Sequence, residues 1–359
     1  MDPIQSEGGE TPRCQQCKRR FQPAISQQNQ KTQTKQAQRF CSPCLRRMQK
    51  PAQVSCKTCQ QNFVPTLALH IADNGKERNY FCSEACRNPQ EQTQARANSA
   101  GPRVIAILNQ KGGTGKTTTA VSIAAGLAHV GEPTLLVDLD AQGNVGVSLG
   151  LQGRQKIHHL LLRNAPIKGC IQKVRKNLDI ITADEGLAAA EIKMSQGGVQ
   201  ARSHHLSQCM AGLQDYRFII LDCAPALSVM NHNALTYADE VLIPVSCDYL
   251  ALIGVKQVLR SLRRVGEQTG RNIHIAGVLP TFYDVRNRVC SDVLGYLRKS
   301  FGQRTLPPVR VNTKLAEAPS HKKTIFEHAP DSNGARDYIR VVEWLRNSAS
   351  AHPAITRAA

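Results

Sequence analysis

A glycine-rich loop at residues 109–119 constrains the fold of this chain more than any other feature of its sequence. The loop reads Asn-Gln-Lys-Gly-Gly-Thr-Gly-Lys-Thr-Thr-Thr, follows an apolar run at 104–108 and precedes a helical pattern at 117–128. Glycines let backbone N–H groups crowd around phosphate oxygens, and the N-terminus of a helix adds partial positive charge. A strand, this loop and a helix in succession predict a phosphate-binding turn.

The end of the loop carries the side chains that a bound nucleotide needs. Lys116 is placed to reach the β- and γ-phosphates, and the Thr117 hydroxyl is placed to bind Mg²⁺. We therefore expect ATP and Mg²⁺ as ligands. The loop residues predicted to bind the nucleotide are Lys111, Gly112, Gly113, Thr114, Gly115, Lys116, Thr117 and Thr118.

From residue 102 onward, short apolar runs alternate with amphipathic stretches. The predicted strands are 104–108, 134–137, 178–181, 218–221, 241–245 and 273–279. Such short β-branched runs are typical of parallel strands that are buried on both faces. Helical patterns such as 117–128 and 254–265 lie between them, so we expect a doubly wound α/β domain with a mostly parallel sheet at 102–347.

Cysteines dominate the region before this domain. Eight of the 13 cysteines form four close pairs, namely Cys14/Cys17, Cys41/Cys44, Cys56/Cys59 and Cys82/Cys86. Paired thiolates suit structural Zn²⁺, and metal binding can fold a segment that has little core. We expect two Zn²⁺ ions, the first held by the first two pairs and the second by the last two. Interleaved pairing and an iron–sulfur cluster are the alternatives.

The cysteine spacing divides the region into two zinc-ribbon-like modules, residues 1–49 and 50–86. Basic residues flank the cysteines, so the modules are expected either to contact DNA or to dock a protein. Residues 87–101 are polar and aperiodic, which is typical of a flexible linker, and 348–359 predict a disordered tail.

The loop departs from the usual phosphate-binding pattern, because Gln110 replaces a glycine and a second lysine, Lys111, opens it. The resulting motif, Lys-Gly-Gly-x-Gly-Lys-Thr, resembles that of ParA/Soj-type partition ATPases of the MinD/ParA class. The resemblance covers 102–347 and implies a deviant P-loop NTPase fold. It also implies that Lys111 reaches across a dimer to the nucleotide of the partner subunit.

Two further segments resemble the carboxylate-bearing strands of this class. Leu-Val-Asp-Leu-Asp-Ala-Gln-Gly-Asn at 136–144 implies that Asp140 positions or polarises the attacking water and that Asp138 supports the Mg²⁺ shell. Phe-Ile-Ile-Leu-Asp at 218–222 resembles a Walker B strand, in which Asp222 contacts Mg²⁺ through water. Carboxylates at the C-terminal ends of strands beside the loop are well placed for such chemistry.

A later segment resembles the part of the class that lies near the nucleotide base. Residues 311–320 match the Leu-x-Glu-Ala-Pro region, and Asn312 corresponds to a position used for nucleotide binding. Arg310 stands where many members have proline.

The charge of the chain predicts a polyanionic partner. Lys and Arg number 46 against 27 Asp and Glu, a formal net charge of +19. Such an excess favours salt-sensitive binding to phosphates without sequence preference. Members of the class bind double-stranded DNA in this way, and the resemblance implies this role for Arg286, Arg288, Arg310, Lys314, Lys322 and Lys323. It also implies an ATP-bound homodimer and a ParB-like adaptor that stimulates hydrolysis.

Several other function classes fit the sequence poorly. A membrane-cycling ATPase needs an amphipathic C-terminal helix, whereas the segment after Asn347 contains Pro353 and almost no bulky apolar residues. No apolar run spans a bilayer and no signal peptide is recognisable, so we expect a cytoplasmic protein without a membrane partner. The resemblance implies that it is also nucleoid-associated. An electron carrier needs bridging cysteines in the α/β domain, and the sequence places none at a dimer face. A tyrosine kinase needs a C-terminal tyrosine cluster, which the sequence lacks.

The predicted function is therefore that of an ATP-dependent, dimerising, DNA-binding ATPase in plasmid or chromosome partitioning or cargo positioning. One alternative stays open. The cysteine region could be a DNA- or protein-interaction regulator, with the ATPase domain acting as a nucleotide-gated dimerisation clamp.

Overall fold

The computed structural model describes residues 53–57, 62–63, 71–73, 78–81 and 101–349, the last range without 154, 164, 197–202, 226–227 and 272. The chain divides into two units, Met1–Pro89 and Gln90–Ala359. This division falls inside the segment 87–101 that the sequence predicts as a linker.

The described part of the N-terminal unit consists of two short antiparallel hairpins. Strand β1 (Val54–Ser55) pairs with β2 (Asn62–Phe63), and β3 (Ile71–Asp73) pairs with β4 (Arg78–Tyr80). The backbone N–H of Lys57 donates to the carbonyl of Tyr80 at 2.8 Å and so connects the two hairpins.

One predicted metal ligand, Cys56, lies among these residues, directly after β1, and is only 1% exposed. No cluster of three possible metal ligands occurs among the residues that the structure describes. The other predicted zinc ligands lie outside the described residues: Cys14, Cys17, Cys41, Cys44, Cys59, Cys82 and Cys86. The zinc sites therefore stay a prediction.

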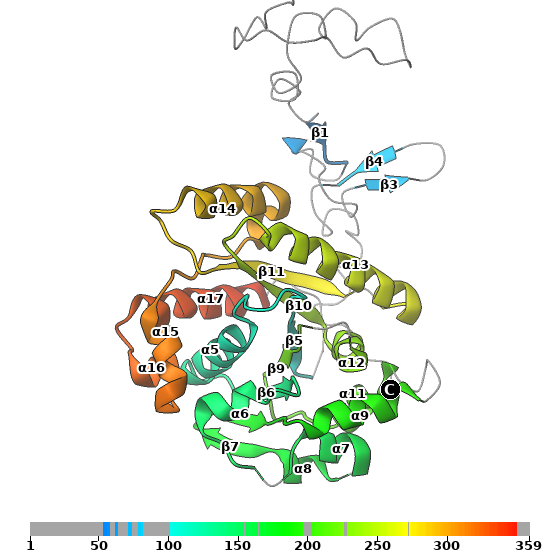
Figure 1. Ribbon diagram of the computed structural model, residues 1–359. Helices are drawn as coiled ribbons and strands as arrows, with labels where there is room; N and C mark the ends of the chain where they lie inside the picture. The colour runs from blue at the N-terminus through cyan, green and yellow to red at the C-terminus, as the bar shows by residue number, and fades with distance from the viewer. Residues whose placement is uncertain are drawn as a thin grey trace, which may run out of the picture. The chain divides into compact units, whose positions relative to one another are not determined.

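The second unit is built on a seven-stranded sheet with the strand order β11-β10-β5-β9-β6-β8-β7 (Figure 1). Its strands are β5 (Arg103–Ile107), β6 (Thr134–Leu139), β7 (Gln172–Arg175), β8 (Leu178–Ile181), β9 (Phe218–Cys223), β10 (Glu240–Ser246) and β11 (His274–Thr281). All neighbouring strands are parallel except β7, which runs antiparallel to β8 at one edge. The predicted, mostly parallel α/β fold is confirmed.

Helices cover both faces of the sheet, and alternate residues of each strand point to opposite faces. In β5, Val104 and Ala106 belong to one apolar cluster, whereas Ile105 and Ile107 belong to the other. The helices are α5 (Lys116–His129), α6 (Asn144–Leu149), α7 (Ile157–Arg163), α8 (Ile167–Cys170), α9 (Gly186–Ser195), α11 (His205–Cys209), α12 (Val229–Tyr237), α13 (Ala251–Thr269), α14 (Arg288–Phe301), α15 (Thr313–Glu317), α16 (Ile325–His328) and α17 (Asn333–Ala349).

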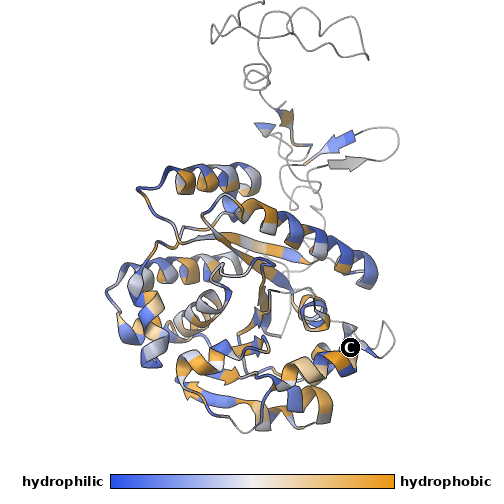
Figure 2. Cartoon of the chain, in the orientation of Figure 1, coloured by the Kyte–Doolittle hydropathy of each residue, from blue (hydrophilic) through white to orange (hydrophobic). Residues whose placement is uncertain are grey.

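The two clusters divide the helices between the faces. Helices α12, α13 and α14 contribute buried residues to the cluster that holds Val104, and α5 and α17 contribute to the cluster that holds Ile105. Helices α13, α14 and α17 are amphipathic, with hydrophobic and hydrophilic faces that Figure 2 distinguishes. Each of them buries one apolar stripe in the core, whereas α5 is buried on nearly all sides.

The structure corrects some element boundaries. Each predicted strand is present, with ends that differ by no more than two residues, but β7 was not predicted. Its sequence, Gln-Lys-Val-Arg, is polar with two half-buried positions, as suits an edge strand. Helix α17 continues to Ala349, two residues beyond the expected end of the domain. Within the described residues, the structure contains no helix with the length and apolarity that a membrane span requires.

Candidate functional site

The glycine-rich loop lies between the end of β5 and the start of α5, as the sequence predicts. Gly113 and Gly115 adopt positive φ angles of 72° and 80°, which side-chain-bearing residues rarely adopt. The buried Asn109 side chain braces the loop, since Nδ2 donates to the carbonyl of Pro244 at 2.7 Å and Oδ1 accepts from the Lys111 N–H at 3.0 Å. The loop is thus anchored to β10.

Lys116 begins α5, and its side chain turns back over the loop. The residue is only 8% exposed, and Nζ donates to the carbonyl oxygen of Lys111 at 3.2 Å. Burial lowers the pKa of Lys116, an effect opposed by the nearby carboxylates of Asp222 and Asp140. A cation is therefore held at the position where the phosphates of a nucleotide would be neutralised.

Two buried carboxylates lie side by side at the ends of adjacent strands. Asp138 of β6 and Asp222 of β9 are partners in the parallel register and are 0% and 1% exposed. Asp138 accepts backbone hydrogen bonds from Asp140 at 3.1 Å and Val145 at 3.2 Å. Neither side-chain oxygen of Asp222 has a hydrogen-bond partner in the described part of the chain.

Burial affects the ionisation of both groups. It raises the pKa of Asp138 to about 7, and the neighbouring Asp140 charge adds to the rise. It also raises the pKa of Asp222 well above its ordinary value, with a further contribution from the Asp138 charge. A buried carboxylate without a partner is costly, so this pair is short of positive charge.

The same residues fit a magnesium ion. The hydroxyl of Thr117 lies close enough to Asp222 to lower the pKa of that carboxyl group. Hydroxyl and carboxylate oxygens are the ligands that a hard divalent cation prefers, and the unpartnered oxygens of Asp222 are available to such an ion or to its bound water. Thr117 and Asp222, with Asp138 beside them, are therefore the residues that would hold Mg²⁺.

Asp140 follows β6 and is half-buried in the turn that leads into α6. Its Oδ1 accepts a hydrogen bond from the Gln142 N–H at 3.0 Å. The turn closes at Gly143, which has a φ of 62° and leaves no room for a Cβ, since that atom would lie 2.7 Å from the carbonyl oxygen of Ala183. The backbone thus fixes Asp140 beside the carboxylate pair.

Lys111 makes a contact that sequence reasoning missed. Its Nζ lies 2.7 and 2.6 Å from the two carboxylate oxygens of Asp248, which follows β10. Asp248 also accepts hydrogen bonds from the Ser246 hydroxyl at 2.6 Å and the Leu250 N–H at 2.9 Å. Although partial burial opposes it, the Lys111 hydrogen bond helps to lower the pKa of Asp248. The sequence did offer one signal for this contact, because Asp248 is a carboxylate three residues past the predicted strand 241–245.

Asn312, which the sequence predicts to bind the nucleotide, makes a hydrogen bond within its own segment. Asn312 caps α15, where its Oδ1 accepts a hydrogen bond from the Lys314 N–H at 2.9 Å.

The predicted DNA-contacting residues differ in their surroundings. Three form ion pairs: Arg286 with Asp284 at 2.8 Å, Arg310 with Asp337 at 2.7 Å, and Lys314 with Glu317 at 2.7 Å. Among the described residues, the other three are exposed and have no ion-pair partner: Arg288, Lys322 and Lys323. The pairing of Arg310 was not visible in the sequence, because Asp337 lies 27 positions away.

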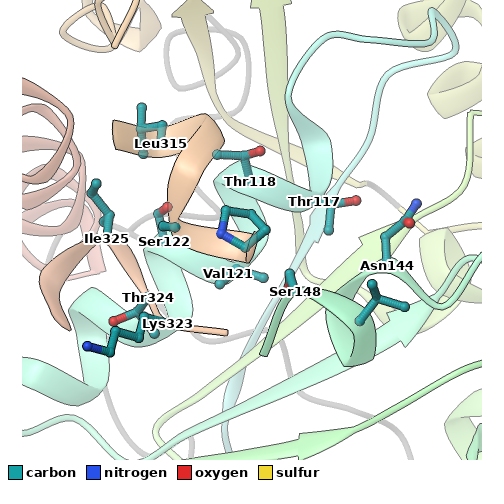
Figure 3. A pocket seen from close by; sticks show the side chains of 13 residues that line it. Thr117, Thr118, Val121, Ser122, Asn144, Ser148, Leu315, Lys323, Thr324 and Ile325 are labelled. Atoms are coloured by element: carbon teal, nitrogen blue, oxygen red, sulfur yellow. The ribbon is translucent and has the colours of Figure 1, made fainter. Parts of the chain in front are cut away.

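A cavity of about 270 Å³ adjoins the end of the loop (Figure 3). Helices α5 and α6 form one part of its wall, and residues 315–325 form the rest. Its lining is Thr117, Thr118, Val121, Ser122, Asn144, Val147, Ser148, Leu315, Ala318, Pro319, Lys323, Thr324 and Ile325. The candidate magnesium ligand Thr117 thus borders a largely apolar space.

Comparison with known proteins agrees with this geometry. A protein family described as an AAA domain matches residues 102–275. The sporulation initiation inhibitor protein Soj of Bacillus subtilis is 39% identical over 243 residues, which are 66% of this chain and 95% of Soj. The chromosome partitioning protein ParA of Caulobacter vibrioides is 36% identical over 252 residues, 68% of this chain and 94% of that protein.

Solved structures share the fold. Cobyrinic acid a,c-diamide synthase from Mycobacterium smegmatis, with a bound ATP analogue and magnesium, is 31% identical with a TM-score of 0.60, covering 71% of this chain and all of that chain. The cell division ATPase MinD of Pyrococcus furiosus is 21% identical with a TM-score of 0.56, covering 68% and 98%, and shows a likeness of fold alone. Together with the loop and the two strand-end carboxylates, the curated relatives establish that the chain belongs to the ParA/Soj family of partition ATPases.

Proposed function

We propose that this chain is an ATP-dependent ATPase that dimerises, binds DNA without sequence preference and acts in plasmid or chromosome partitioning or cargo positioning. The observation that carries the proposal is the arrangement around the loop. Lys116 and Lys111 lie on it, and the unpartnered carboxylate of Asp222 ends the strand beside it. This is the charge pattern that a nucleoside triphosphate and a divalent cation would complete.

Binding would use groups that the loop already presents. The backbone N–H groups of residues 112–117 would surround the phosphates, and Lys116 would exchange its contact with the Lys111 carbonyl for a phosphate oxygen. Thr117 and Asp222 would hold Mg²⁺, with Asp138 supporting them; when bound, this ion supplies positive charge for the transferring phosphoryl group. Asp140 would orient the attacking water, since it lies just past the end of the strand that carries Asp138.

Lys111 would link nucleotide binding to dimerisation. Its side chain is 31% exposed and that of Asp248 is 44% exposed. Ion pairs with this much exposure contribute about 0–1 kcal/mol, so Lys111 can leave Asp248 at little cost. We infer that it then contacts the nucleotide of a partner subunit, and that the closed dimer joins the DNA-binding surfaces of two copies.

The remaining roles are suggested by one of the named relatives, the chromosome partitioning protein ParA of Caulobacter vibrioides. We propose a ParB-like adaptor that stimulates hydrolysis and releases the dimer from DNA. The protein would then cycle on and off the nucleoid in the cytoplasm.

Hydrolysis tests the site itself. We expect Asp222→Asn to abolish Mg²⁺-dependent release of phosphate from ATP, because the variant loses the carboxylate that faces the ion. Asp215→Asn is the matched control, since Asp215 is exposed and lies in the turn before β9. Wild-type turnover in Asp222→Asn would contradict the assignment.

For the N-terminal unit we propose two structural Zn²⁺ ions. The proposal is supported by the burial of Cys56 and by the hydrogen bond that joins the two small hairpins. Elemental analysis of the full chain should find two Zn²⁺ per molecule, and fewer in Cys56→Ser. Cys209→Ser, in the α/β unit, should keep both ions. Equal zinc content in wild type and Cys56→Ser would contradict the proposal.

A further inference from the structure

Helix α13 carries a row of positive side chains that the sequence analysis did not single out. Its exposed face presents Lys256, Arg260, Arg263 and Arg264. The opposite face is buried in the core by Val255, Val258, Leu262 and Val265. Residues three and four apart lie on one face of a helix, so the four cations form one continuous surface, which we call the α13 basic face.

The charge of the α13 basic face is not neutralised within the described structure. No Asp or Glu of the described residues forms an ion pair with any of the four side chains. Glu267 is the only acidic residue of this 19-residue helix. Arg286, Arg310 and Lys314, by contrast, each bring a carboxylate with them, so they offer less net charge to an incoming phosphate.

The spacing of the cations suits the backbone of duplex DNA. At a rise of 1.5 Å per residue, Lys256 and Arg263 lie about 10 Å apart along the helix axis. One DNA strand presents a phosphate about every 3.4 Å along the duplex axis, hence about three phosphates over that length. The long side chains of Lys256, Arg260 and Arg263, which follow one another along this face, are therefore spaced so that each reaches a different phosphate.

The rest of the exposed face favours DNA over a lipid surface. From Lys256 to Thr269, the exposed residues other than the cations are Gln257, Glu267 and Gln268. A membrane-bound helix lays apolar side chains along its length in the lipid, whereas the exposed large apolar residues here, Tyr249, Leu250 and Ile253, gather at the N-terminal end of the helix. The cationic stretch itself exposes no large apolar side chain.

We propose that the α13 basic face binds the phosphate backbone of double-stranded DNA. The inference rests on the proposed DNA-binding function and deepens it by naming the surface that makes the contact. It also changes which basic residues we expect to contribute most to DNA binding, because the unpaired cations of α13 contribute more than the paired Arg286, Arg310 and Lys314.

The test compares two triple variants of the full chain. The first is Lys256→Gln, Arg260→Gln and Arg263→Gln. The control is Lys173→Gln, Lys176→Gln and Lys193→Gln, which removes the same charge from exposed positions elsewhere. The measurement is the affinity for a fluorescent DNA duplex of arbitrary sequence, with ATP and Mg²⁺, over a series of salt concentrations.

Counterion release sets the expected size of the effect. Each lost phosphate contact lowers the slope of log K against log salt by about 0.9, so the α13 variant should lose about 3 per bound protomer. Its affinity at 0.1 M salt should fall on the order of 10²-fold. The control should bind within about twofold of wild type, because the charges that it removes touch no phosphate and release no counterions from the DNA. ATP hydrolysis without DNA and the thermal unfolding midpoint should be unchanged in both variants.

Each result decides a different question. Wild-type chain that binds no DNA in any nucleotide state overturns the proposed function and this inference together. Wild-type DNA binding with an undiminished α13 variant, or with an equal loss in the control, overturns the inference alone. Wild-type binding to phosphatidylserine vesicles that the α13 variant loses while keeping its DNA affinity also overturns it. If the triple variant unfolds early, Arg260→Gln alone should lower the slope by about 1.

Discussion

Replacing Arg310 by alanine should destabilise the α/β unit rather than only weaken DNA binding. The Arg310 guanidinium forms a forked contact with Asp337 of α17, with Nε and one terminal nitrogen 2.9 and 2.7 Å from the two carboxylate oxygens. The backbone N–H of Arg310 donates to the same carboxylate at 3.0 Å. Arg310 thereby fastens the segment before α15 to α17.

The burial of the two partners sets the expected magnitude. The Asp337 side chain is 1% exposed and that of Arg310 is 34% exposed. Removing one partner of a buried pair costs about 3–5 kcal/mol, because the other charge stays buried without compensation. Asp337 would keep the backbone N–H of Arg310 and a distant Arg340 at 3.7 Å. Because these contacts keep part of the compensation, we expect a loss of about 2–3 kcal/mol in the free energy of unfolding, less than the full cost of removing a partner.

Urea unfolding followed by tryptophan fluorescence would measure this loss. Trp344 is the only tryptophan of the chain and packs from α17 against the core, so it reports on the α/β unit. The double variant Arg310→Ala with Asp337→Asn should be more stable than Arg310→Ala alone, because it lacks the buried charge. A loss below about 1 kcal/mol, the value of an exposed pair, or a double variant whose loss equals the sum of the single losses, would mean that Arg310 does not compensate a buried charge on Asp337.

Three further substitutions test the site. Lys116→Ala should abolish ATP binding in equilibrium titration, since the loop loses its buried cation; binding at wild-type affinity would exclude that role. Asp140→Ala should keep ATP binding, lose turnover and stay on DNA longer in a dissociation assay, so unchanged turnover and residence would contradict its role with the water. Asp248→Asn should change the free energy of unfolding by less than about 1 kcal/mol. Because the substitution releases Lys111, it should also tighten ATP-dependent dimerisation by up to about fivefold in sedimentation experiments. Weaker dimerisation would mean that Asp248 serves the dimer directly.

Much of the α/β fold could be predicted because its strands are buried on both faces. Strands β6 and β9 contain the apolar runs 135–137 and 218–221, and the loop between β5 and α5 has a composition that few other turns share. The exception, β7, is a polar edge strand with no such pattern. The sequence predicted which residues stand at the carboxyl ends of the strands, and the parallel topology brought Asp138 and Asp222 together.

The contacts between charged side chains could not be predicted in this way. Nothing in the spacing along the chain shows that Lys111 meets Asp248 or that Arg310 meets Asp337, because these pairs are separated by 137 and 27 positions. The α13 basic face was missed for a related reason. Its cations became distinct only when the structure showed which side of the helix is exposed and which charges already have partners.

Nucleotide control of DNA binding through Lys111 can be tested by measuring DNA affinity in three nucleotide states. The full chain would be titrated with a duplex of arbitrary sequence at fixed salt, with Mg²⁺-ATP, with Mg²⁺-ADP and without nucleotide. We predict tight binding with Mg²⁺-ATP alone and the loss of this binding in Lys111→Ala. Equal binding in all three states, or ATP-dependent binding that survives in Lys111→Ala, would contradict it.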